Sequence, residues 1–145
     1  MRVPKSLRTL VSWQAGRVAT IGSRLTSEHM PSESRADFAV LASLVEQGAL
    51  SQADLGRILG LDRNNVNGIV TRLEAADLIK RRTDPDDRRR NIVTVTASGR
   101  AHFAMLQEHA GIVQNELLTG LTQAEQRQLV ELLDRVLAAH PTLPA

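Results

Sequence analysis

The chain has 145 residues, of which 42% are hydrophobic and 23% are charged, and this balance is ordinary for a single globular domain. The formal net charge is only +2, so binding to a polyanion would depend on local clusters of cations rather than on the total charge. The sequence contains no cysteine, which excludes disulfide bonds, thiolate metal sites and thiol-based redox sensing.

Two helices are predicted before residue 48. The first runs from Lys5 to about Glu28 and has an apolar stripe at helical spacing. It carries Trp13 and Arg17, which lie four residues apart on one side. Ser34 is expected to cap the second helix, with Asp37 at the fourth position of a capping box.

A short helix, a tight turn and a longer helix come next. The first is predicted at 51–60, where Ser51 supplies the N-cap and Gly60 ends the helix. The second is predicted at 62–77, with Asp62 as its cap and apolar residues at i, i+3, i+4 and i+7. Two short amphipathic helices joined by a glycine turn are typical of a helix-turn-helix.

The outward face of the second helix is polar and almost free of apolar bulk. Asparagine is a poor helix former, and Gly68 in mid-helix costs roughly 1 kcal/mol relative to alanine. A solvated surface is the simplest interpretation, but asparagine also pairs with adenine in the major groove. Within a helix-turn-helix we favour DNA recognition, with base contacts from Asn64, Asn65, Asn67 and Thr71 and phosphate contacts from Arg57, Arg63 and Arg72.

A basic hairpin is predicted at 78–96. Its strands are Leu78–Arg82 and Asn91–Thr96, and Asp and Pro residues lie between them. A projecting basic hairpin beside a recognition helix defines a winged helix-turn-helix, which would extend over 34–96. The wing residues expected near DNA are Asp87, Arg88, Arg89 and Arg90.

Two hypotheses describe how the wing contacts DNA. Because Arg89 follows Asp87 by two residues, the carboxylate can hold its guanidinium in place, aimed at a narrow minor groove. Alternatively, Arg88, Arg89 and Arg90 form an interchangeable cationic cluster that contacts phosphates.

Two further helices are predicted after the wing. One runs from Ala97 to about Thr119, and the other begins at a capping box formed by Thr122 and Glu125. These two helices and the first helix of the chain each have an apolar stripe that the winged module could not cover. We therefore predict a helical dimerisation region at 1–30 and 97–140, although a monomer whose terminal helices wrap its own core is the alternative. The expected fold class is mainly α with a small β-hairpin wing, that is, α+β.

These motifs together resemble the MarR family of transcriptional regulators. The segments that resemble the family are Leu55–Leu61, Val70–Glu74, Asp84–Arg89 and Val93–Gly99. The chain departs from the family at two positions, because the family usually has glycine where Asp77 stands and a larger residue where Gly68 stands.

The resemblance has several implications for this chain. It implies one MarR-like domain over 1–145, a homodimer, a pseudo-palindromic double-stranded DNA operator and repression of transcription. It also implies an effector, a small aromatic anion, for which Trp13 could stack on the ring and Arg17 could pair with the carboxylate. The simpler alternative is that Trp13 is dimer core and Arg17 is a solvated cation.

Signatures of other protein classes are missing from the sequence. No phosphate loop, dinucleotide fingerprint or catalytic grouping is evident, and we expect neither an enzyme nor a cofactor or metal. No apolar run has the length of a membrane span and no signal peptide is recognisable, so we expect a cytoplasmic protein. The alternative function is a winged-helix protein-interaction or RNA-binding module without operator-specific DNA binding.

Overall fold

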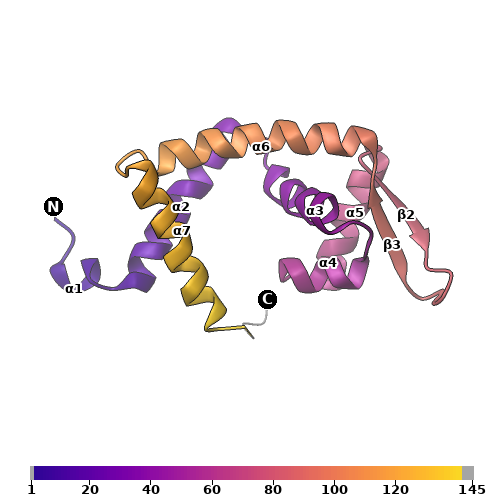
Figure 1. Ribbon diagram of the computed structural model, residues 1–145, viewed down its shortest axis with the longest axis horizontal. Coiled ribbons are helices and arrows are strands. Elements are labelled where there is room, and N and C mark those ends of the chain that lie inside the picture. The colour runs from indigo at the N-terminus through magenta and orange to yellow at the C-terminus, as the bar shows by residue number, and fades with distance from the viewer. Residues whose placement is uncertain (1, 142–145) are drawn as a thin grey trace. The chain divides into compact units, whose positions relative to one another are not determined.

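A computed structural model describes residues 2–141 of the protein, which form two compact units. One unit is built on residues 33–108, and the other on residues 2–32 together with residues 109–139. The division falls within helix α6 (Ala97–Leu117), whereas the apolar pattern placed the end of the DNA-binding module at residue 96. Figure 1 labels the helices and strands in chain order.

The unit at 33–108 is a winged helix-turn-helix. Two strands pair as an antiparallel hairpin from Ile79↔Val95 to Thr83↔Asn91, and this hairpin projects beyond the helices of its unit (Figure 1). In chain order the elements before α6 are α3 (Ser34–Gln47), β1 (Leu50–Ser51), α4 (Gln52–Leu59), α5 (Arg63–Ala75), β2 (Ile79–Thr83) and β3 (Asn91–Val95).

The sheet has a third strand that the sequence did not predict. β1 pairs with the other edge of β3 through Leu50↔Val93 and Ser51↔Ile92, so the strand order is β1-β3-β2. A strand of two residues has no recognisable alternation and exists only because β3 lies beside it. Its effect is to attach the start of α4 to the base of the wing.

The predicted caps of the helix-turn-helix are confirmed. The Ser51 hydroxyl accepts the Asp54 N–H at 3.0 Å, and the Asp62 carboxylate accepts the Asn65 N–H at 2.9 Å. Gly60 ends α4 in the left-handed conformation, with φ at 65°. These local interactions fix where both helices begin and how sharply the chain turns between them.

The wing joins α5 and α6 through two unusual residues. Asp77 has a left-handed φ of 59°, and its carbonyl accepts the Thr96 hydroxyl at 2.6 Å. The same Thr96 oxygen caps α6 by accepting the Gly99 N–H at 2.9 Å. A side chain at Gly99 would overlap the Leu78 carbonyl oxygen, which explains the glycine at this position.

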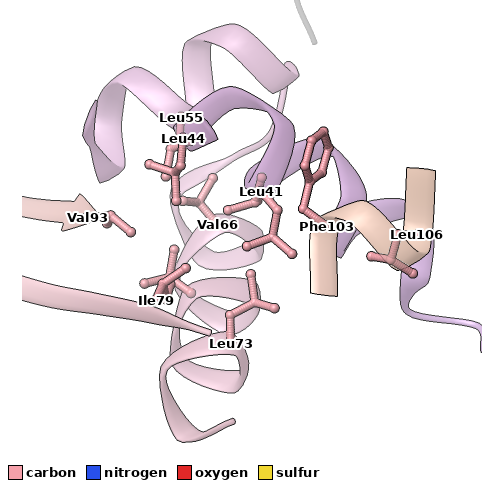
Figure 2. Close-up of a cluster of buried hydrophobic side chains, with 11 residues drawn as sticks. Leu41, Leu44, Leu55, Val66, Leu73, Ile79, Val93, Phe103 and Leu106 are labelled. Atoms are coloured by element: carbon pink, nitrogen blue, oxygen red, sulfur yellow. The ribbon is translucent and has the colours of Figure 1, made fainter. Parts of the chain in front are cut away.

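The apolar core of this unit packs against the buried face of α5 (Figure 2). Leu41 and Leu44 of α3, Leu55 of α4 and Leu73 of α5 are each at most 1% exposed. Truncating one such leucine to alanine costs about 2–5 kcal/mol, because it removes buried apolar area and leaves a cavity. The core therefore holds the orientation of α5. Ile79, Val93, Phe103 and Leu106 complete it from the sheet and from α6.

The predicted cap of α3 is wrong. Ser34 is the first residue of the helix rather than its cap, and Glu33 occupies the cap position without a side-chain hydrogen bond. Asp37, expected to complete the capping box, instead binds the Arg72 guanidinium. A charged partner offers the carboxylate a stronger interaction than a main-chain N–H does.

The second unit contains α1 (Lys5–Arg8), α2 (Val11–His29), the end of α6 and α7 (Gln123–Ala138). The single long helix predicted from Lys5 is wrong, because the chain leaves the helical conformation at Leu10. The Thr9 hydroxyl and the Gln14 amide satisfy the freed carbonyls of Ser6 and Arg8.

One contact in the second unit connects two of its helices. His29 of α2 lies 3.0 Å from Glu116 of α6. Thr122 and Glu125 form the predicted capping box at the start of α7. Within residues 2–141, none of the helices has both the length and the apolar content needed to cross a membrane.

Candidate nucleic-acid interface

A broad groove of about 1270 Å³ lies between the helix-turn-helix and the wing. The beginnings of α4 and α5 line one side through Gln52, Arg63, Asn64 and Asn67, and the wing lines the other through Arg89. Most of these side chains are polar or cationic, and the N-terminus of a helix carries partial positive charge. The groove thus combines the positive ends of two helices with arginine side chains, which suits a polyanion.

The centre of the exposed face of α5 is formed by Asn64, Gly68 and Thr71, spaced i, i+4 and i+7. All three are exposed, and they lie opposite the buried Val66 and Val70. A Cβ atom added at Gly68 would meet nothing within 4 Å, so the glycine is not required for packing inside this chain. Its absent side chain leaves the helix backbone open to close approach from outside.

The three predicted asparagines have different surroundings. Among the described residues, Asn64 has no hydrogen-bonding partner for its side chain. The Asn65 amide donates to the Asp62 carboxylate at 2.7 Å, and the Asn67 amide oxygen accepts from Arg81 at 3.1 Å. Only Asn64 therefore has both of its polar atoms available for a ligand.

Arg72 is already paired with acidic residues of its own chain. Its guanidinium donates twice to Asp37, at 3.0 and 2.5 Å, and lies 3.3 Å from Glu33. Hydrogen bonding to Asp37 raises the pKa of Arg72 above its ordinary value. The Arg72 side chain is only 34% exposed, and the residue fastens α5 to α3. This placement favours a structural role for Arg72 over the phosphate contact that the sequence suggested.

Arg57 and Arg63 lie closer to the predicted role. Arg57 forms an ion pair with Asp54 but keeps 73% of its side chain exposed, and Arg63 is exposed without a side-chain partner in the described region. Hydrogen bonds from Ser51 and then from Arg57 lower the pKa of the Asp54 carboxyl. Asp54 therefore stays ionised and holds Arg57 beside the first turn of α4.

The three wing arginines are not equivalent. The Arg89 side chain is 93% exposed. Its main-chain N–H nevertheless donates to Asp87 Oδ1 at 3.0 Å, and its side-chain Nε lies 3.5 Å from the same oxygen. Arg90 turns back toward Asp54 and Asp84, at 3.7 and 3.9 Å. Arg88 has no ion pair within the described chain. The geometry thus agrees with an Arg89 guanidinium directed outward by Asp87.

Arg81 is a site residue that the sequence prediction missed. It is a half-buried residue of β2 and forms an ion pair with Glu74 of α5 at 3.0 Å. The sequence prediction placed it only within the strand Leu78–Arg82 of the basic hairpin and gave it no role. Strand alternation was the available signal, because Arg81 shares its face with the buried Ile79 rather than with the exposed Lys80.

Two comparisons with known proteins decide the family. The MarR family model matches residues 34–90. A solved structure of BpsR from Bordetella bronchiseptica superposes with a TM-score of 0.77 at 30% identity, covering 87% of this chain and 97% of that one. The chain belongs to the MarR family. The resemblance inferred from the motifs and the expected fold class are both confirmed.

Other MarR-family relatives indicate the kind of protein involved. The transcriptional repressor NicR of Pseudomonas putida is 32% identical over 100 residues, which are 69% of this chain and 63% of NicR. The matched part of the chain thus spans slightly under two thirds of that relative. A MarR variant from E. coli, solved in complex with operator DNA, superposes with a TM-score of 0.73 at 25% identity over 88% of this chain and 93% of its own. These relatives are transcriptional regulators or DNA-binding proteins, not enzymes.

Proposed function

We propose that this MarR-family chain is a transcriptional repressor that binds a specific double-stranded DNA operator in the cytoplasm. One observation supports the proposal: the exposed polar face of α5 and the outward-directed Arg89 side chain line the same groove. The major groove of B-DNA accommodates an α-helix, and the adjacent minor groove attracts arginine. Neither a protein-binding nor an RNA-binding winged helix requires both features together.

The proposed contacts follow from the exposure and the existing partners of each side chain. Asn64 and Thr71 lie at the centre of the exposed face of α5 and are assigned to base edges, with Asn65 and Asn67 at its flanks. Arg63 is assigned to a phosphate because it is exposed and unpaired within the described chain. Arg57 joins it from α4, Arg89 enters the minor groove, and Arg88 and Arg90 strengthen the local positive charge.

A homodimer is the proposed assembly. The α7 helix exposes Val130, Leu133 and Leu137 at i, i+3 and i+7, and their exposed fractions are 46, 44 and 62%. Val11 of α2 is 71% exposed. A contiguous apolar stripe of this kind is typical of a protein interface. A second copy of the chain would cover it around a two-fold axis, and the two recognition helices would then bind half-sites about one DNA turn apart.

The proposed effector is a small aromatic anion. The BpsR structure is described as explaining regulation of DNA binding by 6-hydroxynicotinic acid. In this chain the Arg17 guanidinium lies over the Trp13 ring, 5.6 Å from its centre. An aromatic ligand would stack on the opposite face of Trp13, and Arg17 would remain near enough to pair with its carboxylate. A Trp13→Ala, Arg17→Ala variant that still folds should bind DNA but lose release by the acid.

Selection from randomised DNA duplexes tests the proposal. Purified protein should enrich a pseudo-palindrome, and footprinting should protect two half-sites about one helical turn apart. Binding should weaken steeply with salt, because phosphate contacts release counterions. Equal affinity for duplex RNA, or binding to every DNA sequence alike, would favour the alternative winged-helix functions.

A further inference from the structure

The Arg81 side chain connects the wing to both helices of the helix-turn-helix. The main-chain N–H of Arg81 and its side-chain Nη2 donate to the two oxygens of the Glu74 carboxylate, at 3.1 and 3.0 Å. Its Nη1 donates to the Asn67 amide oxygen at 3.1 Å, and the Gln52 amide oxygen lies 3.5 Å away. Because Glu74 anchors one edge of the planar guanidinium, the other edge is held toward Asn67.

This contact determines which way the Asn67 amide faces. A guanidinium has only hydrogen-bond donors, so the amide must turn its oxygen toward Arg81. The NH₂ group of Asn67 is then directed away from Arg81. Bidentate pairing with adenine uses the asparagine oxygen and the NH₂ group at the same time. With its oxygen held by Arg81, Asn67 is suited to donate rather than to pair in that way.

Asn65 shows the opposite arrangement on the same helix. The Asp62 carboxylate has only acceptors, and it takes the Asn65 NH₂ group at 2.7 Å. Asn65 therefore presents its oxygen, whereas Asn64 has no partner within the described residues. Three identical side chains thus offer three different hydrogen-bonding patterns to a ligand.

We propose that Arg81 is a specificity-determining residue for DNA recognition. By holding the Asn67 oxygen, it makes Asn67 a donor that selects an acceptor on the base edge. Guanine offers two such acceptors, O6 and N7, and thymine offers O4, whereas adenine offers only N7 beside its own N6 amino donor. Bidentate adenine recognition is left to Asn64. This proposal rests on the proposed function, because it requires α5 to lie in the major groove of duplex DNA.

The test is a comparison of base preferences. Selection from randomised duplexes is carried out with the wild-type protein and with the Asn67→Ala, Arg81→Ala and Arg82→Ala variants. Arg82 is the control because it is the next cation of the same strand and is exposed. Asn67→Ala should flatten the preference at one position of each half-site by about three- to tenfold, the value of one hydrogen bond. Guanine or thymine should occupy that position in the wild-type selection.

Arg81→Ala should change the preference at that same position by raising the share of adenine, since the Asn67 amide can then rotate and pair with adenine through both of its polar atoms. Arg82→Ala should weaken binding to all sequences about equally. Asn67→Asp provides a second test if Arg81→Ala fails to fold. The carboxylate still accepts from Arg81 but donates nothing, so the preference should be lost as it is in Asn67→Ala.

Three results would overturn the assignment. They are an adenine preference at the Asn67-dependent position of the wild type, an unchanged preference in folded Arg81→Ala, and a selected site with no position that depends on Asn67. A wild-type protein that selects no sequence at all would instead remove the proposed function.

Discussion

The ion pair between Arg72 and Asp37 allows a structural role to be separated from a DNA contact. Arg72→Gln removes the cation and leaves Asp37, which is 7% exposed, without a charged partner. Breaking a fully buried pair in this way costs about 3–5 kcal/mol. Because 34% of the Arg72 side chain is exposed, water can reach the vacated position, and we expect a loss of about 2 kcal/mol.

Urea denaturation at fixed protein concentration measures the loss of stability, and a salt series on the selected operator measures the DNA contact. A structural Arg72 leaves the slope of log affinity against log salt unchanged. Arg63→Gln is the matched control, because Arg63 is exposed and is assigned to a phosphate. Each phosphate contact contributes about 0.9 to the size of this slope, and a dimer would lose two such contacts. The slope for Arg63→Gln should therefore be smaller by about two units. An Arg72→Gln variant with unchanged stability and a slope as low as that of Arg63→Gln would refute the structural assignment.

Four further predictions concern the wing and the helix caps. Asp87→Ala should weaken operator binding about threefold, because the carboxylate positions the Arg89 guanidinium. Arg89→Ala should weaken operator binding more than Asp87→Ala does. Tighter binding by the Asp87→Ala variant would show that Asp87 only repels DNA. Asp77→Gly should raise the unfolding free energy by up to about 1 kcal/mol in thermal or urea denaturation, since glycine adopts the φ of 59° without strain. Gly99→Ala should lower it by at least about 2 kcal/mol, because the new methyl group would overlap the Leu78 carbonyl. Because the pKa of Asp54 is lowered in the folded protein, its ionised carboxylate stabilises the wild type relative to Asp54→Asn. This difference in unfolding free energy should have its full size above about pH 5 and should shrink as the pH falls below the ordinary carboxyl pKa of 3.8. A difference that grows on acidification would contradict the lowered pKa.

The winged module was predictable because its signals are local. Ser51, Gly60 and Asp62 each act on main-chain groups within a few residues, and the structure places each in its predicted role. The apolar spacing of α5 likewise depends only on the helical repeat. Asp77 adopts a left-handed conformation, which fits the glycine that the family usually has at this position.

Two features without a recognisable signal in the sequence escaped prediction. β1 requires β3, which lies some forty residues later in the chain. The break before Val11 depends on competing hydrogen bonds of Thr9 and Gln14 and is marked by neither proline nor glycine. Local sequence patterns carry no direct information about either event.

The candidate site shows the same division between local and distant information. The outward face of α5 follows from helical periodicity, and the Asp87–Arg89 contact follows from a spacing of two. The partner of Arg72 lies 35 residues away in sequence, and that of Arg81 lies seven residues back across a turn. Tertiary contacts therefore separate the arginines that are paired within the fold from those that remain exposed.

The central claim is that the polar face of α5 recognises a specific DNA sequence. The most direct measurement is the ratio of affinities for the selected operator and for a duplex of equal length with scrambled half-sites, at about 0.15 M salt. We expect a ratio of at least about 10³ for the wild-type protein, and a much smaller ratio for an Asn64→Ala, Thr71→Ala variant that remains folded. A wild-type ratio near one, or a ratio that the double substitution leaves unchanged, would contradict it.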